Sequence, residues 1–128
     1  MNDKTAIGLL LLRLFLGIRI IYGVMDNLFS WEHMQEFAGF LASFHFPVPI
    51  VSAVTSVLIQ SICGLLILIG WQTRWAAGLL AVNFIVALTM VHFRNGDTIE
   101  AMTPALAILF ISAALAFTGP GRYAVDKM

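Results

Sequence analysis

The stretch Thr5–Met25 reads TAIGLLLLRLFLGIRIIYGVM and is apolar along almost its whole length, with Arg13 and Arg19 as its only charged residues. A helix rises about 1.5 Å per residue and must cross about 30 Å of hydrocarbon, so a stretch of this length suffices for one membrane crossing. Its length, its two arginines and the lack of a small-x-small cleavage site after it argue against a removable signal peptide. We therefore expect a retained transmembrane helix at about 5–26.

Three further apolar segments follow. There are 37 consecutive residues without Asp, Glu, Lys or Arg between Glu36 and Arg74, then 19 between Arg74 and Arg94, then 21 between Glu100 and Arg122. Each of the later two runs fits one crossing, and the first fits one crossing plus a loop. We expect these spans at about 48–69, 75–92 and 99–117, separated by polar turns that contain glycine.

The segment between the first two spans mixes charged and aromatic residues. Its larger apolar residues recur at helical spacing (Trp31, Met34, Ala38 and Leu41), and prolines follow at positions 47 and 49. This pattern predicts a short interfacial helix at about 31–45, at the level of the lipid headgroups. The sequence thus predicts an all-α fold, an integral membrane four-helix bundle with a short interfacial helix, in a single transmembrane domain over residues 1–128.

Composition agrees with a membrane protein and excludes other classes. Hydrophobic residues make up 60% of the chain and charged residues 11%, against roughly 25% charged in ordinary soluble domains. The lipid bilayer is therefore the expected partner. A net charge of zero without a basic cluster argues against nucleic-acid binding. The single cysteine, Cys63, excludes an intrachain disulfide and a vicinal dithiol.

The distribution of basic residues predicts the orientation. Four crossings place both termini on one side, together with four basic residues near the span ends (Lys4, Arg74, Arg122 and Lys127), whereas the other side carries Arg94. Because loops rich in Lys and Arg stay in the cytoplasm, we expect both termini there, in a membrane of the bacterial inner-membrane type.

Polar residues at depth are the first candidates for function. Arg13, Gln60 and Asn83 each lie about 12–15 Å from the cytoplasmic interface at 1.5 Å per residue, so we expect them to converge in one layer. Gln60 also belongs to a polar stripe on one face of the second span (Ser52, Thr55, Ser56, Gln60 and Cys63). Such groups either hold helices together by hydrogen bonds or line a ligand pocket.

A second candidate group lies nearer the outside. Arg19, Tyr22 and Asp26 share one face of the first span, and His92 and Glu100 are expected at similar heights on the third and fourth spans. A buried Arg19 needs an anion, which Glu100 or Asp26 could supply, and His92 could relay protons. The alternatives are an ion pair that fixes helix positions and an arginine that extends to the interface.

No catalytic or metal-binding constellation is visible in the sequence. There is no Ser-His-Asp set, no glycine-rich phosphate loop and no HxxxH or Glu-x-x-His spacing. Mid-span histidine pairs for haem are also missing.

Three motifs carry a resemblance to a known family: Arg13-Leu14-Phe15-Leu16-Gly17 followed by Tyr22-Gly23, Gly64-Leu65-Leu66 with Gly70 and Thr73-Arg74, and Gly119-Pro120-Gly121-Arg122-Tyr123-Ala124-Val125-Asp126. Together they resemble the DoxX family of small four-helix membrane proteins. The resemblance spans nearly the whole chain, and the terminal motif is its most specific part. It implies an association with terminal oxidase and thiosulfate:quinone oxidoreductase assemblies, or with membrane complexes that handle oxidative stress.

Two positions depart from the pattern that the resemblance implies. Asp26 stands where the family often has a basic residue, and Gln60 stands where it often has a glutamate. An amide can accept a hydrogen bond from Arg13, but it cannot neutralise the guanidinium or carry a proton. The departure at Gln60 therefore argues against a proton-handling pair of Arg13 and Gln60.

Three classes of function stay open. The first is a subunit of a membrane oxidoreductase that holds a quinone against Arg13, Gln60 and Asn83 or against Arg19, Tyr22, His92 and Glu100, with a redox partner protein. The second is a binder or transporter of lipophilic small molecules. The third is a structural scaffold that forms homo- or hetero-oligomers through small residues.

Overall fold

The computed structural model describes residues 3–92, 96 and 98–124. These residues form helices and their connections, with no strand among them. The elements are α1 (Asp3–Phe29), α2 (Trp31–Ala42), α3 (Pro49–Ile69), α4 (Thr73–Ala87), the π-helix η1 (Leu88–His92) and α6 (Ile99–Thr118).

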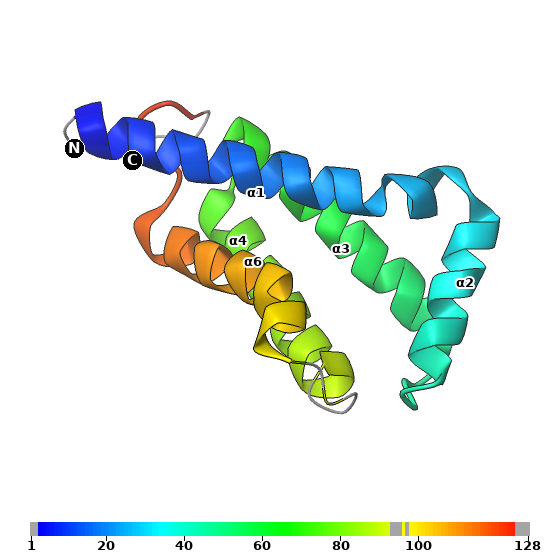
Figure 1. Cartoon of the computed structure of the whole chain (residues 1–128). Helices are drawn as coiled ribbons and strands as arrows, with labels where there is room; N and C mark the ends of the chain where they lie inside the picture. The colour runs from blue at the N-terminus through cyan, green and yellow to red at the C-terminus, as the bar shows by residue number, and fades with distance from the viewer. Residues whose placement is uncertain (1–2, 93–95, 97, 125–128) are drawn as a thin grey trace.

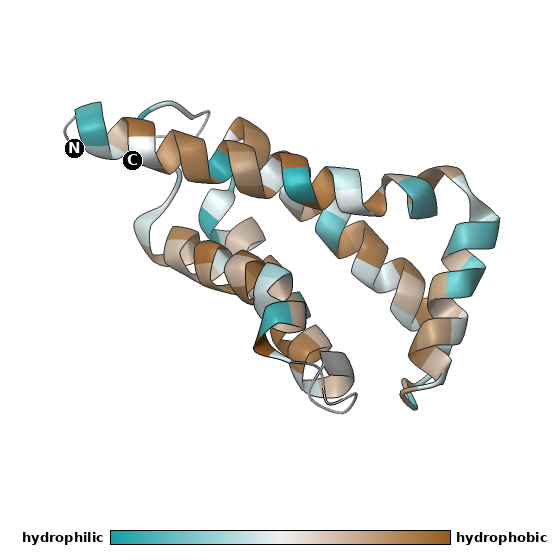
Figure 2. Cartoon of the chain, viewed as in Figure 1, coloured by the Kyte–Doolittle hydropathy of each residue, from teal (hydrophilic) through white to brown (hydrophobic). Residues whose placement is uncertain are grey.

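Four helices are long and apolar enough to cross a membrane: α1, α3, the continuous segment Thr73–Met90 of α4 and η1, and α6. Their outward faces carry large exposed apolar side chains, as expected of helices in contact with lipid. Figure 2 shows this apolar character along the four long helices and more hydrophilic turns in α2. The predicted fold class, an all-α membrane four-helix bundle, is confirmed.

The helices form two arms that meet at the end of the bundle where α1 begins and α6 ends (Figure 1). One arm consists of α1, α2 and α3, and the other consists of α4, η1 and α6. We call the end with both termini the terminal end and the opposite one the α2 end. The arms diverge toward the α2 end, so the molecule is a wedge rather than a parallel bundle.

The hydrophobic core follows this division. At the terminal end, one cluster joins the four long helices through Leu16, Ile67, Leu80 and Leu115. Toward the α2 end it is replaced by two separate clusters. One lies within α1, α2 and α3 (Val24, Met34, Ala38, Leu41, Ala53 and Val57), and the other lies between η1 and α6 (Leu88, Met102 and Ala105). The arms therefore share a core at one end only.

Local signals explain where the helices begin and end. Ser30 caps α2, because its hydroxyl accepts a hydrogen bond from the backbone N–H of His33. Pro49 occupies the first position of α3, where no backbone donor is needed. Gly70 ends α3 with a φ of 78°, and its N–H donates back to the carbonyls of Leu66 and Ile67.

The third span contains a feature that the sequence analysis did not predict. Regular α-helix ends at Ala87, and the chain continues as the π-helix η1 over Leu88–His92. The hydroxyl of Thr89 donates to the carbonyls of Ile85 and Val86 at 2.9 and 3.3 Å. Short π-helical turns within α-helices are frequent at functional sites.

Candidate ligand site

Arg13 lies at the terminal end in a cage of backbone carbonyls. Its side chain is 2% exposed. Nε donates to Ile67 O at 3.0 Å and Nη2 to Leu68 O at 3.0 Å, both near the end of α3. Nη1 donates to Pro120 O at 3.2 Å and Tyr123 O at 2.6 Å, in the segment after α6. One side chain thus ties α1 to α3 and to the segment after α6.

The prediction that Arg13 joins Gln60 and Asn83 was wrong. The last carbonyls of a helix have no partner within the helix and carry partial negative charge, so they satisfy a guanidinium well. Gln60 lies seven residues before Ile67 on α3, about 10 Å along the axis at 1.5 Å per residue. Residue counting placed Arg13 in the layer of Gln60 and Asn83, whereas its guanidinium bonds to carbonyls near the end of α3.

Close backbone approaches surround this cage. A Cβ on Gly17 would lie 2.8 Å from Leu68 Cβ and 3.0 Å from Gly64 O. A Cβ on Gly70 would clash with Ala124 and lie 2.8 Å from Arg13 Nη2. Arg122 also forms an ion pair with Asp3 at this end. Residues from all three motifs that carried the family resemblance, among them Arg13, Gly70 and Ala124, therefore form a structural junction in which α1, α3 and the segment after α6 interlock.

Gln60 and Asn83 do come together, through Ser56. Gln60 Nε2 donates to Ser56 Oγ at 3.1 Å, and Ser56 Oγ donates to Asn83 Oδ1 at 3.0 Å. This chain of hydrogen bonds links α3 to α4 with partly buried side chains. No charged residue takes part in it.

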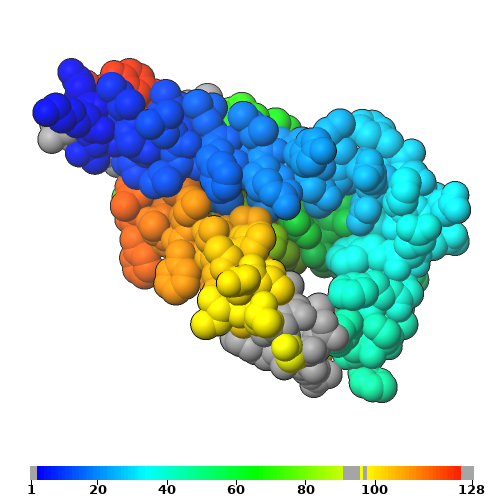
Figure 3. All heavy atoms as spheres, viewed as in Figure 1, coloured from blue at the N-terminus to red at the C-terminus, as the bar shows by residue number. Residues whose placement is uncertain are grey.

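The chain of hydrogen bonds lies in the wall of a cavity of about 720 Å³ between α2, α3 and α4. We call it the uncharged cavity, because no Asp, Glu, Lys or Arg is among the described residues that line it. Its polar wall consists of Ser52, Thr55, Ser56, Gln60, Asn83 and Thr89, and aromatic and aliphatic side chains form the rest. In the view of Figure 3, the molecular surface is notched between α2 and the start of α6, where the arms diverge.

The polar stripe predicted on the second span contributes four of its five residues to this wall, Ser52, Thr55, Ser56 and Gln60. The fifth, Cys63, is buried in the core at the terminal end instead. Sequence reasoning missed the opposite wall, where Phe37, Phe40 and Phe46 from α2 and its following loop close the cavity. The sequence signal for this wall is the aromatic-rich amphipathic pattern of α2, which by itself predicts only a helix at the lipid interface.

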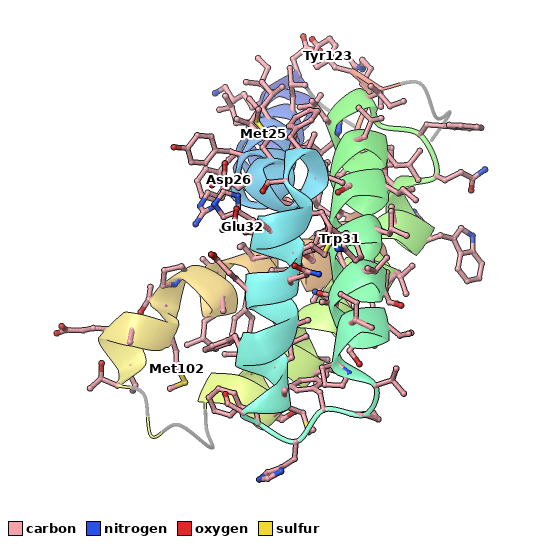
Figure 4. All side chains as sticks on the ribbon, turned by 90° about the vertical axis from the view of Figure 1, so that its right-hand side faces the viewer. Met25, Asp26, Trp31, Glu32, Met102 and Tyr123 are labelled. Carbon is pink, nitrogen blue, oxygen red and sulfur yellow. The ribbon has the colours of Figure 1, made fainter. Side chains whose placement is uncertain are left out.

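The predicted outer group is dispersed. Arg19 lines a second cavity of about 250 Å³ between α1 and α6, which we call the Arg19 cavity. Tyr22 is 75% exposed and lines neither cavity, and Glu100 is exposed in the first turn of α6. Figure 4 shows Asp26 beside Glu32 at the corner between α1 and α2. The side chain of His92 lies outside the described residues.

The chemical groups around the uncharged cavity limit what it can hold. Within the described part of the chain, no group of three or more His, Cys, Asp or Glu side chains is placed to hold a metal ion. The uncharged cavity instead offers amide and hydroxyl groups in an apolar surround, which is the usual composition of small-molecule pockets.

The fold and the cavity thus define a small integral membrane protein with four spanning helices and a cavity between its arms. A family model described as DoxX matches residues 8–93, and the chain belongs to that family. The matched range leaves out the Gly119–Asp126 motif. Searches of curated proteins and of solved structures found no match to the chain.

Proposed function

We propose that this protein binds a lipophilic redox molecule of the quinone class in the uncharged cavity, as a component of a membrane oxidoreductase system. The observation that carries the proposal is the hydrogen-bonded chain from Gln60 through Ser56 to Asn83 in the wall of an otherwise apolar cavity. A quinone ring is neutral and carries carbonyl oxygens, so it needs donors but no opposite charge.

The side chain of Asn83 supplies a donor of this kind. Its Oδ1 accepts from Ser56, and its Nδ2 group makes no hydrogen bond within the described residues. An amide nitrogen carries two hydrogens. Asn83 would therefore donate to a quinone carbonyl, and Gln60 Nε2 would provide the second hydrogen that it does not direct at Ser56.

The size of the cavity supports the same class of ligand. About 720 Å³ falls within the roughly 300–1,000 Å³ of small-molecule pockets in general. The ring would lie between the phenylalanines of α2 and the polar residues of α3, and the hydrocarbon tail would leave between the diverging arms. The redox centre itself would belong to a partner protein, in line with the assemblies with which DoxX-like proteins are associated.

The orientation is part of this proposal. Lys4, Arg74 and Arg122 lie at the terminal end, near the ends of the spans, and basic residues favour the cytoplasmic side. The uncharged cavity would then lie in the outer half of a bacterial-type inner membrane. A reporter fused after Met128 should be active in the cytoplasm and inactive in the periplasm; the reverse result would contradict this orientation.

A second candidate is a binder or carrier of lipophilic molecules without redox change. The π-helix η1 favours it, because Thr89 and Met90 of η1 line the uncharged cavity, and irregular spanning helices recur at the binding sites of transporters. Pro104 inside α6 lines the Arg19 cavity on the other arm. Transport of a quinone analogue between vesicles by the purified protein alone would favour this candidate over the first.

The test is a calorimetric titration of the purified protein with a short-chain quinone analogue. Asn83→Leu and Gln60→Leu should each weaken binding about tenfold, the equivalent of one hydrogen bond at about 1.4 kcal/mol. Ser61→Ala is the matched control, since Ser61 is partly buried on α3, bonds to Val57 O and lines neither cavity. Absence of saturable binding by wild type, or binding by both leucine variants as tight as that by wild type, would contradict the proposal.

A further inference from the structure

The Arg19 cavity differs from the uncharged cavity in chemistry. Its volume is about 250 Å³, and its wall combines Arg19, Ile20 and Gly23 of α1 with residues of α6 such as Pro104 and Ile108. Gln60 and Phe84 line both cavities. The two cavities therefore share part of a wall, one extending between α1 and α6 and the other between α2, α3 and α4, and Arg19 gives the first a positive charge that the described lining of the second lacks.

The guanidinium of Arg19 has no partner within the described protein. Among the residues that the structure describes, Arg19 forms no hydrogen bond and no ion pair. Asp26 and Glu100, the acidic residues expected to neutralise it, are both exposed, and their carboxylates form no hydrogen bond or ion pair with a described residue. The side chain extends over Gly23, where an added Cβ would lie 2.9 Å from Arg19 Nη1.

The charge lies within the membrane-spanning part of the fold. Nη1 of Arg19 lies at the level of Gly23, six residues before the end of α1 at Phe29, which is about 9 Å from that end at 1.5 Å per residue. A charged side chain at such depth costs several kcal/mol unless it is paired or hydrated. An anion on Arg19 would remove this cost, and the described residues supply none there.

The volume of the Arg19 cavity limits the size of the anionic ligand that it can enclose. A volume of about 250 Å³ is below the roughly 300–1,000 Å³ of pockets that enclose a whole small molecule. It suffices for a headgroup. The apolar wall of Ile20, Ala105 and Ile108 continues between α1 and α6, where a hydrocarbon chain would lie in contact with lipid.

We propose that the Arg19 cavity binds the carboxylate or phosphate headgroup of a single-chain membrane amphiphile, whose hydrocarbon chain lies between α1 and α6. Arg19 pairs with the anion through its planar fork of N–H donors. This inference does not rest on quinone binding, because it concerns the Arg19 cavity and not the uncharged cavity.

The test uses purified protein in a neutral detergent and three probes of equal chain length: dodecanoate, dodecyl phosphate and dodecanol. Native mass spectrometry measures how much of each probe the protein retains, and a thermal-shift assay measures how much each probe stabilises it. Wild type should retain the two anionic probes at least tenfold better than dodecanol. Arg19→Met should lose this preference, and Arg19→Lys should keep part of it. Arg74→Met is the matched control, since Arg74 is exposed at the start of α4 and lines neither cavity.

Several outcomes would overturn the inference. Equal retention of dodecanol, or unchanged anion binding by Arg19→Met, would remove the role of the guanidinium. If inorganic phosphate alone stabilised the protein as much as dodecyl phosphate does, the ligand would be a free anion and not an amphiphile. If wild type were a dimer and Arg19→Met a monomer, the anion that pairs with Arg19 would be an acidic group of a second copy of the chain. Because quinone-analogue binding by Arg19→Met should stay at the wild-type level, failure here is distinguishable from failure of the uncharged cavity.

Discussion

Arg13 and Arg19 lie six residues apart on one helix and have opposite surroundings. Arg13 is 2% exposed and donates to four backbone carbonyls, whereas Arg19 is exposed and has no partner within the described residues. Six residues correspond to about 240° around a helix, so the two side chains leave α1 on different faces. The comparison teaches that the helix face on which an arginine lies, more than its depth in the membrane, decides whether it has a structural role or is available to a ligand.

The largest expected effect separates the two arginines by stability. Arg13→Met leaves several buried carbonyls without donors and releases the segment after α6, so it should lower the free energy of unfolding by about 3–5 kcal/mol. Arg19→Met removes no described contact and should change it by at most about 0.5 kcal/mol without added amphiphile. Unfolding of both variants in mixed detergent micelles measures the difference.

Equal losses for Arg13→Met and Arg19→Met would break the comparison, because they would show that Arg19 also has a structural partner. A loss below about 1 kcal/mol for Arg13→Met would show that the carbonyl cage contributes little net stability.

An intermediate effect is expected where α1 and α3 approach most closely beside Arg13. Gly17→Ala places a methyl group 2.8 Å from Leu68 Cβ, and overpacking of this kind costs about 1–3 kcal/mol. Gly78→Ala on α4 is the matched control, because nothing lies within 4 Å of its Cβ position. That variant should be neutral or stabilise by up to about 1 kcal/mol. The same unfolding assay applies, and a larger loss for Gly78→Ala than for Gly17→Ala would contradict the packing described for the junction.

The smallest of the three expected effects concerns Gln60. Because Gln60 bonds to Ser56 and not to Arg13, Gln60→Leu removes one hydrogen bond and should lower the free energy of unfolding by about 1 kcal/mol. Ser56→Ala should have a similar effect. If Gln60→Leu alone lowered the free energy of unfolding by about 3 kcal/mol or more, Gln60 would have to bond to a charged group. That result would contradict the separation of the terminal end from the uncharged cavity.

The sequence was informative where one physical effect dominated. One apolar stretch with two arginines and three charge-free runs predicted four spanning helices, because a buried charge in lipid is costly whatever the tertiary structure. Helical periodicity placed five residues of α3 on one face, and the structure puts four of them in the wall of the uncharged cavity, whereas Cys63 lies in the core. Gln60 and Asn83 were expected at one height, and they meet through Ser56.

The rest depended on relations between helices that no periodicity encodes. Arg13 had acceptors available on α3 and after α6, and only the packed structure decides between these carbonyls and Gln60. The wedge shape follows from separate cores at the α2 end, and it turns the aromatic face of α2 into a cavity wall. The π-helix η1 has no sequence signature of the kind that a proline or a glycine gives.

Photocrosslinking with a quinone analogue that carries a photoreactive group on its ring most directly tests whether the uncharged cavity is the ligand site. We expect saturable labelling confined to peptides of α2, α3 and α4 that line the cavity, such as those containing Phe40, Thr55 and Val82. Excess unlabelled quinone should suppress it, and Asn83→Leu should reduce it about tenfold at subsaturating probe, like the affinity. Labelling that does not saturate, or that falls mainly on the lipid-facing residues Leu11 and Phe15 of α1, would contradict a binding site in the uncharged cavity.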